Sequence, residues 1–134
     1  MEIMTKELMP ADKERVKQMN PVVLAFVGDA AYTLLVRRNL ALESNCKTGE
    51  LNRRASEIVS AHGQSERAER ILPLLNEEEE SIYRRGRNAK KVTKSKNASV
   101  VEYARSTGLE AVMGYLYLTG QTERILELFF GEEV

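Results

Sequence analysis

The chain has 134 residues, of which 43% are hydrophobic and 30% charged, and its 20 basic and 20 acidic side chains cancel. These values are typical of one soluble globular domain with a proper core, and the zero net charge is unlike that of most nucleic-acid-binding domains. One cysteine, Cys46, and one histidine, His62, exclude an internal disulfide and a two-histidine zinc or catalytic site. The acidic first twenty residues exclude a secretory signal, so we expect a cytoplasmic protein without a membrane span.

Helices are predicted throughout, with no convincing alternating strand, so the expected fold class is all-α. The first helix should begin at Asn20-Pro21, because Asn is a good N-cap and Pro suits the first helical position. It should run to about Arg38 and form the buried central helix, since it is apolar nearly all round. We expect one domain over residues 1–134, with 1–19 as an N-terminal extension.

Capping signals divide the rest of the chain. Expected helices begin at Thr48, at about Ser65 with an end near Pro73, after Asn76 with an end at Gly86, at Ser99, and at Thr122. Gly108 is expected to mark a bend in the helix that follows Ser99.

Two acids stand alone in apolar stretches. Asp29 is the only charged residue between Asn20 and Val36, and Glu110 is the only one between Ser106 and Thr122. An ionised carboxylate in apolar surroundings is costly unless a cation or hydrogen bonds compensate it. The pair predicts a shared site for a hard divalent ion, Mg²⁺ with Mn²⁺ as a substitute. The alternative is a structural carboxylate bonded to an arginine or a helix end.

Residues near the two acids extend the prediction. Ser106 and Thr107, one turn before Glu110, are expected to orient it or a bound water. From residue 84 to 96 the chain carries seven basic residues and no acid. Such a segment suits phosphate oxygens, although a solvated loop is the alternative. The residues expected to contact the phosphate backbone of a nucleic acid are Arg84, Arg85, Arg87, Asn88, Lys90, Lys91, Lys94 and Lys96.

Three motifs in order, LAFVGDAAY, RGRNAK and YARSTGLEAVMGYLYL, resemble the ribonuclease III catalytic domain, in its short bacterial Mini-III branch. The resemblance implies an all-helical, homodimeric endoribonuclease that cuts double-stranded RNA with Mg²⁺ and leaves 5′-phosphate ends. It also implies maturation of the large (23S) ribosomal RNA precursor, with a bound ribosomal protein as a partner.

The resemblance assigns Asp29 and Glu110 as the catalytic residues and metal ligands. Acids that the longer ribonucleases III carry correspond to Val22, Ala25 and Thr107 here. No segment similar to a double-stranded RNA-binding domain follows, so we expect the catalytic dimer to hold the RNA. The missing acids keep a second hypothesis open, a non-catalytic dimerisation or RNA-binding module. A metal-dependent nucleotide hydrolase on a helical bundle is a third.

Overall fold

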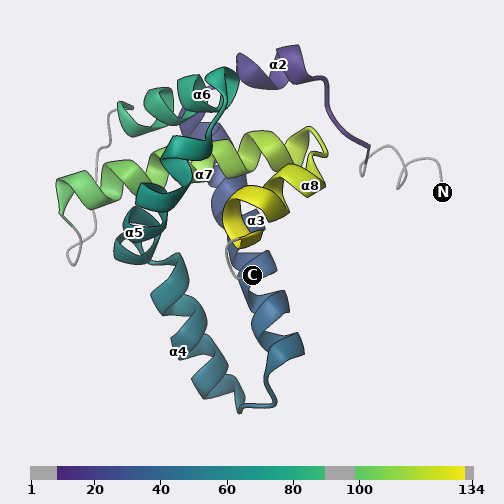
Figure 1. Cartoon of the computed structure of the whole chain (residues 1–134), viewed down its shortest axis with the longest axis vertical. Helices are drawn as coiled ribbons and strands as arrows, with labels where there is room; N and C mark the ends of the chain where they lie inside the picture. The colour runs from purple at the N-terminus through teal and green to yellow at the C-terminus, as the bar shows by residue number, and fades with distance from the viewer. Residues whose placement is uncertain (1–8, 90–98, 132–134) are drawn as a thin grey trace.

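The computed structural model describes residues 9–89 and 99–131. Its elements in chain order are α2 Lys13–Lys17, α3 Pro21–Glu43, α4 Thr48–Val59, α5 Ala61–Ile71, the short 3₁₀ turn Leu72–Leu74, α6 Glu77–Arg87, α7 Val100–Leu118, α8 Thr122–Ile125 and the π-helical turn Leu126–Phe130 (Figure 1). The part of the chain that the structure describes contains no strand, so the all-α prediction is confirmed.

The helix boundaries follow the capping residues. Asn20 accepts from the amide of Val22, and Asn76 and Ser99 form capping boxes with Glu79 and Glu102. Some predicted limits were wrong. α3 continues past Arg38 to Glu43, because no glycine or proline interrupts it, and α5 starts at Ala61 because Ser60 caps it. α7 passes through Gly108 as one helix.

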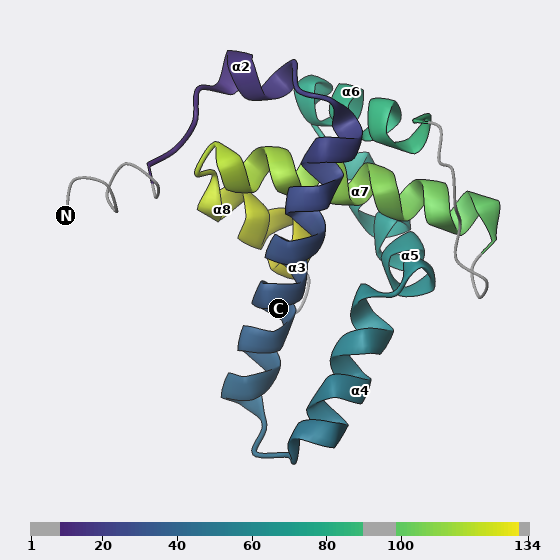
Figure 2. The same cartoon turned by 180° about the vertical axis from the view of Figure 1, so that it is seen from behind.

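The central element is α7, and the prediction of a buried α3 was wrong. Every residue of α7 from Ser106 to Leu116 is buried except Glu110. α3, α5 and α6 pack against α7, and the second half of α3 projects with α4 as a hairpin (Figures 1 and 2). Because α3 has only one covered side, several of its apolar residues remain exposed.

α3 and α7 cross with their backbones in contact. A Cβ atom added at Gly28 would overlap the carbonyl oxygen of Glu110, and one at Gly114 would overlap the carbonyl oxygen of Leu24. Two glycines, one on each helix, therefore permit an approach that any larger residue would prevent. Among the described helices, none has the length and apolar content that crossing a membrane requires.

The crossing can be tested with alanine. Gly28→Ala should lower the free energy of unfolding by about 3 kcal/mol, because its Cβ forces the backbones of α3 and α7 apart. Gly49→Ala is the matched control: that glycine also lies in a helix and has no atom within 4 Å of an added Cβ. It should be neutral or stabilise by up to about 1 kcal/mol. Urea denaturation measures both, and equal effects would contradict the close approach.

Candidate active site

Asp29 lies at the α3–α7 crossing, directly after Gly28, and its side chain is exposed. The expectation that it is buried among apolar residues was wrong. Among the residues that the structure describes, none donates a hydrogen bond to its carboxylate or forms an ion pair with it. An exposed carboxylate without a protein partner pays little desolvation cost and can accept a cation from solvent.

A hollow of about 400 Å³ opens beside Asp29. Its other lining residues are mainly apolar and come from α3 and α7: Phe26, Val27, Ala30, Ala31, Leu34 and Tyr117. The candidate site therefore lies on the edge of an exposed apolar surface.

Glu110 reaches the same crossing from α7, since its backbone carbonyl is the group that Gly28 contacts. The structure thus brings the two predicted acids, 81 positions apart in the sequence, onto adjoining positions of two crossed helices. Glu110 is half-buried, and its Oε2 accepts a hydrogen bond of 3.0 Å from Nε2 of Gln64 on α5.

Gln64 is a site residue that the sequence analysis missed. It is only 2% exposed, and it also donates to the carbonyl of Val59 at 2.9 Å. The available signal was its position in the inward-facing stripe of α5, where Ala68 and Ile71 follow at helical spacing. A polar residue in such a stripe requires a buried partner.

Ser106 and Thr107 are buried, and each hydroxyl donates to the carbonyl of Tyr103, at 2.8 and 3.0 Å. Their hydrogens are therefore used inside α7, whereas Gln64 donates to Glu110 from α5. A role for the two hydroxyls toward a bound water stays a prediction.

The donor set of the crossing suits Mg²⁺. The described residues contain no group of three or more His, Cys, Asp or Glu side chains placed to hold a metal. Mg²⁺ needs no such cage, because it is commonly bound through one or two carboxylates and keeps several waters. The two predicted acids, Asp29 and Glu110, match that number of hard oxygen ligands.

The predicted RNA-binding segment begins on α6, which packs against the part of α7 that carries Glu110. Gly86, in the last turn of α6, packs against Gly108 and Ala111 of α7, which bracket Glu110. Arg84, Arg87 and Asn88 are exposed at this end of α6. Arg87 lies over the Tyr83 ring at 5.8 Å and donates to Asn88 Oδ1.

Arg85 differs from its neighbours. It is half-buried and donates to the backbone carbonyls of Lys17 and Met19, at 2.7 and 2.8 Å, which fixes α2 against α6. The remaining predicted RNA contacts, Lys90, Lys91, Lys94 and Lys96, lie outside the described residues.

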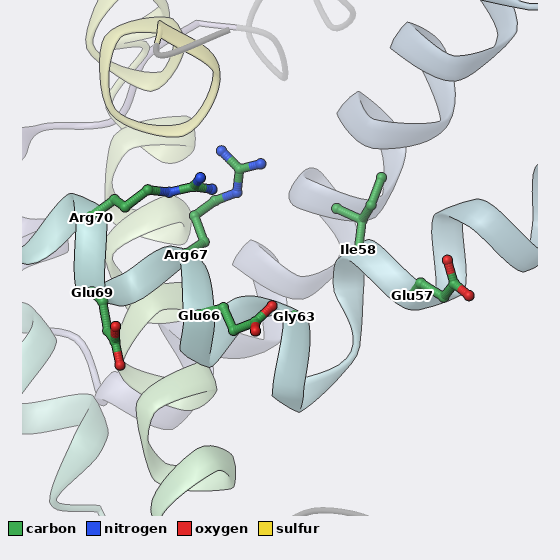
Figure 3. Close-up of a pocket in the computed structure, with 7 residues that line it drawn as sticks. All are labelled: Glu57, Ile58, Gly63, Glu66, Arg67, Glu69 and Arg70. Atoms are coloured by element: carbon green, nitrogen blue, oxygen red, sulfur yellow. The ribbon is translucent and has the colours of Figure 1, made fainter.

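A larger hollow of about 520 Å³ lies along α4 and α5 and contains none of the predicted site residues (Figure 3). Charged side chains dominate its lining: Glu57, Glu66, Arg67, Glu69 and Arg70. Arg67 is committed to the fold, since it donates to the carbonyl of Phe129 at 2.6 Å. The α3–α7 crossing, where the sequence predicted the site, therefore stays the candidate active site.

His62 joins the two helices that carry Gln64 and Glu110. Its Nδ1 lies 2.6 Å from the Glu102 carboxylate on α7, and this hydrogen bond raises the pKa of His62 above its ordinary value. The contact is exposed and supports the packing of α5 on α7, so His62 has no evident chemical role at the crossing.

The sequence of this domain matches a known family. A family model of the ribonuclease III domain matches residues 22–121, which include both acids and the end of α6. A helical domain with two carboxylates at a helix crossing is thereby placed among the ribonucleases III.

Individual relatives narrow the assignment. The chain is 45% identical to Mini-ribonuclease 3 of Thermoanaerobacter sp. (87% of this chain, 84% of that protein) and 46% identical to that of Streptococcus pneumoniae (84% and 90%). A crystal structure of a Fusobacterium nucleatum protein matches with a TM-score of 0.79 and 31% identity (88% of this chain, 94% of that chain). The chain therefore belongs to the Mini-ribonuclease 3 branch of the ribonuclease III family and is an endoribonuclease.

Proposed function

We propose that the chain is a homodimeric, Mg²⁺-dependent endoribonuclease that cleaves double-stranded RNA, with Asp29 and Glu110 as its catalytic acids. The observation that carries the proposal is the exposed Asp29 beside Glu110 at the α3–α7 crossing. The ribonuclease III family acts on double-stranded RNA, and the relatives named Mini-ribonuclease 3 support the same substrate class here.

In this proposal Asp29 and Glu110 hold Mg²⁺ directly or through water, and Mn²⁺ can substitute. When bound, the ion supplies Lewis-acid activation of water and neutralises charge on the phosphate and on the departing oxygen. The protein contributes two carboxylates on helices whose relative position is fixed by backbone contact. Asp29 is open to solvent, so a phosphate of the RNA backbone can approach it without a large rearrangement of the protein.

The surface around Asp29 supports a homodimer. Apolar side chains are exposed there in the single chain: Val23 at 45%, Phe26 at 78%, Leu34 at 63% and Tyr117 at 50%. Together with Ala30 they form what we call the α3 face. A contiguous apolar patch of this kind marks an interaction surface, and a twofold axis lets one patch pair with its copy. With Asp29 on the edge of the α3 face, dimerisation places two active sites close to one duplex.

The exposed cations at the end of α6 support binding of the RNA backbone. Arg84 and Arg87 present positive charge on α6, the helix that packs through Gly86 against the part of α7 that carries Glu110, and the predicted lysines follow in the sequence. Nonspecific attraction of phosphates is electrostatic and needs no base contact. A locally basic surface is therefore compatible with a net charge of zero.

We further propose that the substrate is the precursor of the large (23S) ribosomal RNA, bound by a ribosomal protein, in the cytoplasm. The Mini-ribonuclease 3 assignment supports this role, because that branch is associated with maturation of this RNA. Cells in which Asp29→Asn replaces the natural protein should accumulate the unprocessed precursor. Normal 23S ends in those cells would contradict the proposed substrate.

Asp29 gives the direct test of catalysis. Asp29→Asn should reduce cleavage of a long RNA duplex by at least about 1,000-fold, because removing a metal-binding charge costs several kcal/mol of transition-state stabilisation. Duplex binding and the melting temperature should stay close to those of the unmodified protein. Cleavage is followed on gels with Mg²⁺ and then with chelator.

Asp12→Asn is the matched control for this substitution, because Asp12 is an exposed aspartate whose role is to cap α2 and Asn caps equally well. It should cleave normally. Full activity of Asp29→Asn, or activity on single-stranded RNA alone, would overturn the proposed function.

The α6 cations predict a change in salt dependence. Replacing both Arg84 and Arg87 with Gln should lower the slope of log affinity against log salt by about 2, one for each lost phosphate contact. Arg53→Gln on α4 is the control, since Arg53 is already paired with Glu50 and Glu57. An unchanged slope in the double variant would place the RNA elsewhere.

The α3 face predicts the effect of a charge on assembly. Phe26→Glu should weaken dimerisation by about 100-fold, the scale of losing a central interface residue. Leu42→Glu, on the same helix and 70% exposed but outside the α3 face, should leave the dimer intact. Analytical ultracentrifugation distinguishes these results. A monomeric unmodified protein, or a dimeric Phe26→Glu, would contradict the homodimer on this face.

A further inference from the structure

The Gln64 amide is a buried polar group whose two donors both have acceptors. Nε2 lies 2.9 Å from the carbonyl of Val59 and 3.0 Å from Oε2 of Glu110. A carbonyl and a carboxylate only accept, so the NH₂ end of Gln64 must face them and each hydrogen is used. The orientation of the amide is therefore dictated by its two partners.

Through these two partners Gln64, which lies on α5, is bonded to two further helices, α4 and α7. Val59 is the last residue of α4, where carbonyls lack donors from their own helix, and Gln64 supplies one from α5. The same nitrogen reaches across to α7 at Glu110. Because Gln64 is 2% exposed, its own position is fixed by packing, and it can fix a neighbour in turn.

Glu110 needs such a support more than a fully buried residue does. A glutamate side chain has three rotatable bonds, and ordering it costs about 1.5–2 kcal/mol. Glu110 is only half-buried, so packing alone restrains it incompletely. A hydrogen bond from a rigid donor selects one arrangement of the carboxylate before any ion arrives.

The Gln64 amide carries no charge, and this affects how Glu110 can bind a metal ion. An arginine or lysine at this position would neutralise Glu110 and compete with a metal ion for it. The neutral amide of Gln64 donates a hydrogen bond but leaves the negative charge of Glu110 available to a metal ion. A carboxylate oxygen has two lone pairs, so Oε2 can accept from Gln64 and still serve as a metal ligand.

We propose that Gln64 is a positioning residue of the active site, which holds the Glu110 carboxylate ready for a divalent ion. The inference rests on the proposed function of Glu110. Gln64 itself is assigned no contact with substrate, and its effect on the reaction passes through Glu110.

Gln64→Met tests the proposal, because Met keeps the length and helix preference of Gln but cannot donate. Mn²⁺ binding without RNA, measured by electron paramagnetic resonance, should weaken about tenfold, the usual scale for losing a group that orients a metal ligand. The Mg²⁺ concentration for half-maximal cleavage should rise by the same factor, and saturating Mg²⁺ should restore most of kcat. Unchanged Mn²⁺ affinity would overturn the proposal.

Ser65→Ala is the control for a general disturbance of α5. Ser65 is also buried and accepts from Arg105 rather than touching Glu110. It should leave the Mn²⁺ affinity unchanged, and an equal loss there would also overturn the positioning role. Asp29→Ala tests the metal site itself, separately from the role of Gln64. If this variant binds Mn²⁺ as tightly as the unmodified protein, the proposed metal site is wrong. If Asp29→Ala loses Mn²⁺ affinity but Gln64→Met does not, only the proposed role of Gln64 is contradicted.

Nuclear magnetic resonance provides a test that does not require the Met variant to fold. In the unmodified protein the side-chain amide of Gln64 should exchange with water far more slowly than that of the exposed Gln18, and its resonances should shift on adding Mg²⁺. Glu110→Ala should abolish the Mg²⁺-dependent shift. If the amide resonances of Gln64 in the unmodified protein do not shift on adding Mg²⁺, the proposal is overturned.

Discussion

The backbone contact between α3 and α7 is the constraint on which the rest of the structure depends. Gly28 and Gly114 let the two helices cross without intervening side chains, and this crossing sets the separation of Asp29 and Glu110. Catalytic groups carried by rigid helices are held more accurately than groups on loops. Gly28 and Gly114 therefore set the geometry of the crossing at which the two proposed catalytic acids lie.

The exposed position of Asp29 changes the physical account of the site. A buried carboxylate would need compensation within the single chain, whereas an exposed one needs none until a partner covers its surroundings. In the proposed homodimer the apolar α3 face is covered, and water near Asp29 is partly displaced. Electrostatic attraction between the carboxylate and a cation strengthens as the local dielectric falls. Dimerisation would then contribute to metal and phosphate binding without adding a ligand.

The sequence predicted the helices well because their ends carry local signals. Asn20, Asn76 and Ser99 cap helices as expected. It mistook α3 for the central helix, because a helix that is apolar all round can be buried by its own chain or covered by another copy, and periodicity does not distinguish these cases.

The sequence also predicted that Asp29 and Glu110 lie near each other, because two isolated acids in apolar helices suggest a common explanation, and the structure places both at the α3–α7 crossing. Gln64 was not identified, because its partner lies 46 positions away and is supplied by tertiary packing alone. The RNA-binding role expected of Arg85 shows the same difficulty, because its tertiary contacts could not be predicted from the sequence. Composition groups it with the other cations, but its guanidinium bonds to the carbonyls of Lys17 and Met19.

A site with two acids and a neutral amide has a consequence for the order of binding. Two carboxylates compensate the charge of a divalent ion but fill few of the six positions that Mg²⁺ requires, so water occupies the others. Phosphate oxygens of the RNA are hard ligands that can replace those waters. Each component then increases the affinity for the other, because binding free energies are reciprocal. In the proposed enzyme, such a site would select its substrate through the RNA backbone and would hold its ion most firmly when a duplex lies across the dimer.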